Sequence, residues 1–91
     1  MSKLYQFKLF LTGSEQKAEK LEAHVRQVLD TVIRDQYTLE LVDVTLAPEA
    51  TEQYMILATP TLSRLKPEPM KRIVGNFENG KHILDALDLS A

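Results

Sequence analysis

The residue types that most often carry out chemistry are few in this chain, and their spacing does not suit it. The 91 residues contain no cysteine, which excludes thiol chemistry, cysteine-type zinc sites and iron–sulfur clusters. The histidines, His24 and His82, lack a spacing such as H-E-x-x-H and do not predict a metal site. Ser14, Thr59 and Thr61 have no histidine placed by sequence to activate them as nucleophiles. The sequence therefore predicts a protein that is not an enzyme and uses no cofactor or metal.

Asp43 is the one carboxylate whose position invites a chemical role. It ends an apolar run, and burial there would raise the pKa of its carboxyl group and suit it to proton transfer. The alternative is a structural carboxylate at a solvent-exposed strand end, which we favour because the chain has no thiol to serve. The segments "GSEQK" and "GNFENGK" lack the G-x-x-x-x-G-K-[ST] spacing of a phosphate-binding loop.

Charge and composition exclude further classes of function. Eleven basic residues against thirteen acidic ones give a net charge of −2, without the basic surplus of a nucleic-acid-binding protein. The basic stretch "RLKPEPMKR" is interpreted as a solvated loop and strand end. No apolar run approaches the roughly 18 residues of a membrane span. The first residues do not predict a signal peptide, and the absence of cysteine favours a cytoplasmic location.

The apolar pattern predicts one α/β domain over residues 1–91, with the element order β-α-β-α-β-β-α. The predicted strands are Leu4–Leu11, Tyr37–Val44, Ile56–Leu62 and Met70–Phe77. The predicted helices run from Glu15 to about Arg34, from Pro48 to Met55, and from Asn79 or Gly80 onward. The first strand is apolar enough to be central, and the strand–helix–strand unit predicts that the first two strands are parallel.

The long helix is predicted to be amphipathic, with Ser14 as its N-cap. Its buried stripe consists of Ala18, Leu21, Val25, Val28, Leu29, Val32 and Ile33. Its solvent-exposed face consists of Glu15, Lys17, Glu19, Lys20, Glu22 and Arg26. In the last helix, Ile83, Leu84 and Leu87 supply the buried side.

Two parallel strands, an antiparallel pair and a closing helix resemble the thioredoxin-like fold. That fold typically has a cis-proline before its third strand, and Pro60 in "ATPTL" is expected to be cis. The redox motif would follow the first strand, where this chain reads Thr12-Gly13-Ser14-Glu15. The resemblance therefore implies a thioredoxin frame with a non-redox use.

Longer motifs resemble the KaiB family, whose members serve the bacterial circadian clock. They are "KLFLTG" from Lys8, "LVDV" from Leu41, "ILATPTL" from Ile56, and "LDL" from Leu87. The segment "PEPMKRIVG" from Pro67 is similar to the family pattern P-P-P-V-R-R-I-I-G. These motifs extend over nearly the whole chain.

The resemblance implies a non-catalytic protein that binds the ring ATPase KaiC, modulates its phosphorylation and output, and recruits or sequesters partners including KaiA and a histidine kinase pathway. It also implies a metamorphic chain, in which a second state rearranges the C-terminal half and self-associates as a dimer or tetramer. Pro60, Pro67 and Pro69 are assigned to that conformational switch. The expected partner-binding residues, at positions where the family presents an aromatic or basic group, are Tyr5, Lys8, Lys20, Lys71 and Arg72. The alternative for each is a half-buried strand residue or a solvated lysine.

The chain departs from the family pattern near its C-terminus. Ala86 replaces a common glycine, whereas Asp88 is retained, and both belong to the predicted switch. Glycine costs about 1 kcal/mol relative to alanine inside a helix, so Ala86 favours the thioredoxin-like state. Tyr54 and Met55 replace a charged pair. These departures indicate a divergent paralogue, with stress adaptation as an alternative to daily timing.

Two other classes remain open. One is a redox-inert thioredoxin-like adaptor that docks on a sensor histidine kinase. The other is a glutathione-handling enzyme, which is disfavoured because no nucleophile follows the first strand.

Overall fold

The computed structural model describes residues 4–13 and 15–89, and it has the predicted element order. The strands are β1 (Tyr5–Leu11), β2 (Tyr37–Asp43), β3 (Thr61–Lys66) and β4 (Lys71–Val74). The helices are α1 (Glu15–Ile33), α2 (Glu49–Gln53) and α3 (Gly80–Ala86). The predicted N-cap, Ser14, lies outside the described residues.

The strands form a single mixed sheet in the order β2-β1-β3-β4. β1 pairs in parallel with β2 and antiparallel with β3, and β3 pairs antiparallel with β4. The expected thioredoxin-like arrangement is therefore confirmed, with β1 in the interior of the sheet. A second packing of the C-terminal half stays a prediction.

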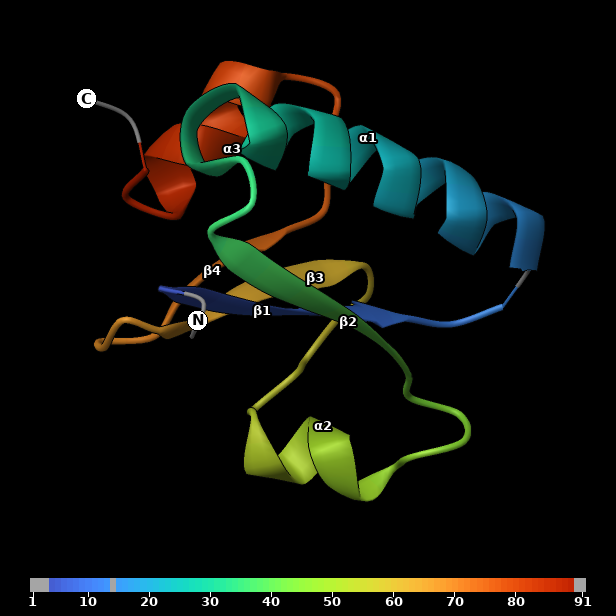
Figure 1. Ribbon diagram of the computed structural model, residues 1–91. Coiled ribbons are helices and arrows are strands. Elements are labelled where there is room, and N and C mark those ends of the chain that lie inside the picture. Colours follow the sequence, from blue (N-terminus) through green and yellow to red (C-terminus); the bar gives the residue numbers. More distant parts are fainter. Residues whose placement is uncertain (1–3, 14, 90–91) are drawn as a thin grey trace.

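Two helices cover one face of the sheet and a third covers the other (Figure 1). α1 and α3 pack over the main core, to which alternate residues of the central strands contribute, including Phe7, Leu9 and Leu62. α2 lies on the opposite face, where Phe10, Ala50 and Ile56 form a smaller cluster. The alternation along β1 thus fills two cores of unequal size, because successive side chains point to opposite faces of a sheet.

The two ends of α3 are set by specific polar contacts. Asn79 Oδ1 accepts a hydrogen bond from the amide of His82 at 3.2 Å, as an N-cap does. Gly80 is the first residue of α3. A Cβ added at Gly80 would lie 3.3 Å from a methyl carbon of Val28, so α1 and α3 approach closely there. At the other end Asp88 has φ +59°, and the amide of Leu89 donates to Leu84 O at 2.7 Å. This is a Schellman motif with aspartate in the position that glycine usually takes.

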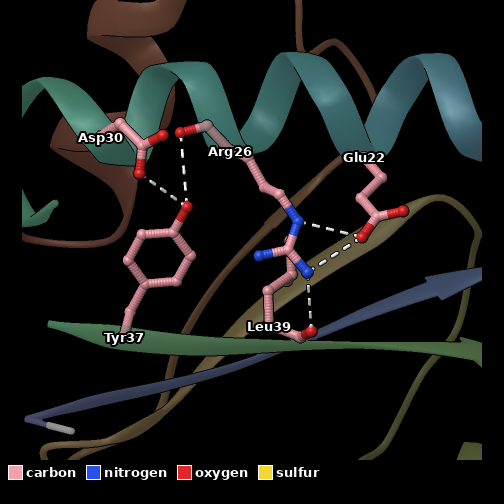
Figure 2. A network of polar contacts seen from close by, with 5 residues as sticks. All are labelled: Glu22, Arg26, Asp30, Tyr37 and Leu39. Carbon is pink, nitrogen blue, oxygen red and sulfur yellow. Dashed lines mark hydrogen bonds and ion pairs between the residues drawn. The ribbon is translucent and has the colours of Figure 1, made fainter. Parts of the chain in front are cut away.

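A polar network ties α1 to β2, and it corrects the prediction that Glu22 and Arg26 face only water (Figure 2). Arg26 Nε and Nη2 each lie 2.9 Å from Glu22 Oε2, and Nη2 also donates to Leu39 O at 3.2 Å. Tyr37 Oη donates to Asp30 Oδ1 at 2.9 Å. Burial and the Asp30 carboxylate raise the pKa of Tyr37. The helix face assigned to solvent therefore takes part in attaching α1 to β2.

Two further sequence predictions are wrong in detail. The strand predicted over Ile56–Leu62 begins only at Thr61, since the chain before Pro60 turns back toward α2 and buries Ile56 in the smaller cluster. Val32, assigned to the buried stripe of α1, is 43% exposed, whereas its neighbour Ile33, assigned to the same stripe, is buried as predicted. The Thr59–Pro60 bond is cis, as predicted.

Candidate functional site

Side chains from all four strands form one row on the face of the sheet that α2 covers. The strand register places Glu40, Lys8, Ser63 and Arg72 next to one another across β2, β1, β3 and β4. Lys8 Nζ lies 3.2 Å from Glu40 Oε1 and 4.9 Å from the centre of the Tyr54 ring. Partial burial lowers the pKa of Lys8, but Glu40 and Tyr54 outweigh it, so the net pKa is raised. Lys8 is therefore a fixed positive charge beside α2.

Arg72 attaches the end of α2 to the sheet. Its Nη1 donates to Tyr54 O at 3.1 Å and to Met55 O at 2.8 Å. These carbonyls follow the last helical turn, where backbone acceptors lack partners within the helix. The Tyr54 ring also packs against Phe10, with the ring centres 5.5 Å apart. Lys8 and Arg72, both predicted as partner-binding residues, thus meet at α2.

Exposed apolar side chains flank α2 on both sides in sequence. Leu46 is 83% exposed, Met55 65% and Leu57 95%. We call these three residues, together with Arg72, the α2 surface. Sequence reasoning missed Leu57 because it was assigned to a strand. Large apolar groups exposed to this degree beside a basic side chain are typical of interaction surfaces.

The other predicted partner-binding residues lie elsewhere. Tyr5 packs against the main core beneath α1 and α3 and stacks on Phe7, with the ring centres 6.3 Å apart. Lys71 is exposed on β4 and alternates with Arg72, so the two side chains leave opposite faces of the strand. Lys20 is exposed on α1 and lines a hollow beside Pro60. The structure does not bring the five residues into one patch.

Asp43 is a turn residue, and the structural alternative for it is confirmed. Its Oδ1 accepts hydrogen bonds from the Thr45 amide at 2.9 Å and from Thr45 Oγ1 at 2.5 Å. These hydrogen bonds lower the pKa of the Asp43 carboxyl group, which is the opposite of the shift that proton transfer near neutral pH would need. Among the described residues, no three side chains of metal-binding type gather in one place.

Arg64, which the sequence analysis interpreted as solvated, holds the segment between β3 and β4 that contains Pro67 and Pro69, here called the proline segment. Arg64 is only 4% exposed, and its guanidinium donates to Leu87 O and to Pro69 O, both at 2.9 Å. The Lys66–Pro67 and Glu68–Pro69 bonds are cis. Arg64 therefore joins the proline segment to the end of α3. Strand alternation could have predicted the burial of Arg64, since Arg64 lies two positions after the core residue Leu62 and therefore on the same face of the strand.

A groove runs between the N-terminal half of α1 and Pro60. It consists of two hollows of about 520 and 230 Å³ that share Lys17, Leu21 and Pro60. His24 Nε2 donates to Phe77 O at 2.5 Å on one side, since a carbonyl oxygen can only accept. We call this the cis-proline groove. In a thioredoxin the redox centre occupies this region, and here no sulfur is present.

The fold is thioredoxin-like, and the groove beside its cis-proline has no cysteine. The oxidised form of mitochondrial thioredoxin 3 from Saccharomyces cerevisiae is similar in structure, with a TM-score of 0.69 at 14% identity, over 94% of this chain and 78% of that one. The N-terminal domain of Synechococcus elongatus SasA is also similar, with a TM-score of 0.69 at 20% identity, over 82% of this chain and 71% of that one. At these identities the likeness shows the fold alone.

Sequence comparison identifies the family. Residues 8–89 match the KaiB domain. The circadian clock oscillator protein KaiB of Parasynechococcus marenigrum (strain WH8102) is 37% identical over 87 residues, which cover 96% of this chain and 84% of that protein. The chain belongs to the KaiB family of circadian clock proteins, which are generally non-catalytic. No helix within the described residues is long and apolar enough to cross a membrane.

Proposed function

We propose that this protein is a non-catalytic regulator that binds a KaiC-like hexameric ring ATPase and modulates its phosphorylation and output signalling. The observation that carries the proposal is the match to the KaiB domain over residues 8–89. The protein acts in the cytoplasm and self-associates in at least one state. KaiA or a sensor histidine kinase is a further partner.

The α2 surface supports a binding role and gives it a location. Leu46, Met55 and Leu57 are exposed in the monomer, and covering them with a partner would remove apolar area from water. Arg72 donates to Met55 O and is of a residue type favoured as an interface anchor. Lys71 is exposed on the same strand, but its side chain leaves the opposite face from Arg72, so it lies outside the α2 surface.

The proposed switch residues lie in the C-terminal part of the fold. Pro60 precedes β3, Pro67 and Pro69 lie between β3 and β4, and Ala86 and Asp88 lie at the end of α3. A rearrangement of this part would have to break the hydrogen bonds that Arg64 makes, so these residues are suited to control it. Control of this rearrangement is a separate proposal from binding to the ring ATPase, and each can hold without the other.

The binding test uses purified components. The KaiC-like hexamer encoded by the same host is mixed with this protein, with ATP or with ADP, and the complex is measured by size-exclusion chromatography and surface plasmon resonance. Leu57→Asp is expected to weaken binding at least tenfold, and Lys71→Glu tests separately whether the interface extends around the sheet edge to the opposite face of β4. Leu4→Asp and Lys81→Glu are the matched controls, because Leu4 and Lys81 are exposed residues away from α2.

Two results would contradict the proposal. Equal effects of the test and control variants would remove the α2 surface from the interface. Absence of any complex with the hexamer, combined with binding to a sensor histidine kinase of the same host, would favour the adaptor function instead. Arg72 is left unchanged because replacing it would detach α2 and confuse the two effects.

A further inference from the structure

The cis-proline groove has the size and lining of a small-molecule site. The larger hollow, of about 520 Å³, falls within the roughly 300–1,000 Å³ range of ligand pockets. Leu21, Pro60 and Phe77 contribute an apolar floor. The hollow is shallow and widely open to solvent, so a compact apolar group would rest on this floor with one side exposed.

Positive charge gathers at one side of this floor. Lys17 and Lys20 both line the larger hollow from exposed positions on α1, and Lys17 also lines the smaller one. Among the described residues that line the larger hollow, Glu78, next to Phe77, is the one with an acidic side chain. The chain as a whole has a charge of −2, so a positive rim is a local feature of this groove and not a general one.

The neutral polar groups of the groove already have partners. His24 Nε2 donates to Phe77 O, and Thr12 Oγ1 lies 3.2 Å from Thr59 Oγ1. The ammonium groups of Lys17 and Lys20 make no hydrogen bond or ion pair within the residues that the structure describes. A ligand would therefore gain its strongest polar contacts from these two lysines, and an anionic head group suits them.

We propose that the cis-proline groove binds a small monoanion with an apolar body, in the class of medium-chain carboxylates. The apolar body lies on Leu21, Pro60 and Phe77, and the carboxylate lies between Lys17 and Lys20, away from Glu78. The site is separate from the α2 surface, which lies on the other face of the sheet. This inference goes beyond the proposed function, because it concerns a ligand of the isolated protein and needs no ring ATPase.

The test compares two probes with the same number of carbon atoms, of which one has an anionic head group and the other a neutral hydroxyl. Octanoate, below its critical micelle concentration, and 1-octanol are each titrated into the ¹⁵N-labelled protein, and backbone amide shifts are recorded. Octanoate is expected to shift the amides of residues 17–24, 59, 61, 77 and 78 saturably, with an affinity at least tenfold higher than that of octanol. Octanol binding as tightly as octanoate, or shifts centred on Leu46 and Leu57, would overturn the proposal.

Charge variants test the orientation. Lys17→Glu and Lys20→Glu are each expected to weaken octanoate binding about fivefold or more, a size consistent with exposed charges. Glu78→Gln is expected to tighten it about twofold, because an opposing charge is removed. Lys81→Glu is the control, since Lys81 is an equally exposed lysine on α3 outside the groove. An equal loss in Lys81→Glu would show a general charge effect and refute the site.

An acidic peptide is the competing occupant. A Leu/Glu peptide that shifts the same amides saturably, with no saturable effect of octanoate, would assign the groove to a protein segment and overturn the small-molecule proposal. Both outcomes are independent of ring ATPase binding, so failure here leaves the proposed function unaffected.

Discussion

The end of α3 offers a single-residue test of how this fold is stabilised. Asp88 takes a left-handed backbone conformation with φ +59° directly after the helix. Its amide donates to Asp85 O at 3.1 Å, and the next amide, of Leu89, donates to Leu84 O at 2.7 Å. Both bonds are formed by the backbone, so a substitution at Asp88 can change the conformational cost of the motif without removing its hydrogen bonds.

The expected magnitude follows from that conformation. A left-handed backbone costs an L-residue about 1–2 kcal/mol, somewhat less for aspartate, whereas glycine adopts it freely. Glycine also has more freedom to lose on folding, by up to about 1 kcal/mol. We therefore expect Asp88→Gly to raise the free energy of unfolding by about 0.5 kcal/mol. Asp88→Ala should lower it by a similar amount, because alanine lacks the short polar side chain that tolerates this conformation.

Urea unfolding followed by circular dichroism measures these differences, and thermal unfolding checks them. For a domain of this size 1 kcal/mol corresponds to about 4–8 °C in Tm, so the glycine and alanine variants should differ by about that much. Ala86→Gly, within the last turn of α3, is the control and should cost about 1 kcal/mol as an ordinary helix substitution. If Asp88→Gly were less stable than Asp88→Ala, residue 88 would not be left-handed in solution and the reasoning would be refuted.

Other positions give independent predictions. Ser63 Oγ is buried without a hydrogen-bond partner among the described residues, so Ser63→Ala is expected to stabilise the protein by about 1 kcal/mol in urea unfolding; destabilisation would indicate a partner for the hydroxyl. Tyr37→Phe removes the bond to Asp30 and should cost about 1 kcal/mol, with Asp30→Asn in the Phe background adding little. The Asp43 carboxyl should titrate below its ordinary pKa of 3.8 by NMR, so its contribution to stability is complete above that pH and is lost as the pH falls through the lowered native pKa. Thr45→Ala should return the Asp43 pKa toward 3.8, and an unchanged titration would contradict the assigned hydrogen bonds.

Local patterns predicted the elements whose signals are local. α1 was found because its large apolar residues recur at helical spacing, and α3 because a short apolar stripe follows Asn79 and Gly80. The predicted strand Ile56–Leu62 was given too early a start, because Ile56 and Leu57 are both apolar but lie in different surroundings. Ile56 is buried beneath α2, while Leu57 is 95% exposed, and an apolar run does not distinguish the two.

The site depended on contacts that no local pattern contains. Lys8 and Arg72 reach the same helix only because β1, β3 and β4 pair in one particular register. Arg64 meets Leu87 O across 23 residues of sequence, and its charge alone indicated solvent. The family resemblance supplied candidate residues one by one and did not say which of them share a surface. Tyr5 and Lys8 lie on opposite faces of the sheet, and this follows from the alternation of side chains along β1.

The way Arg72 holds α2 bears on how this surface can diversify. Arg72 bonds to the carbonyl oxygens of Tyr54 and Met55, and every residue type offers such an oxygen. The side chain at position 55 can therefore be exchanged among residues that tolerate its left-handed backbone (φ +55°) while the helix stays attached at the same point. In evolution or in protein engineering, a partner preference could thus be rewritten at the α2 surface by single substitutions, without a compensating change in the sheet beneath it.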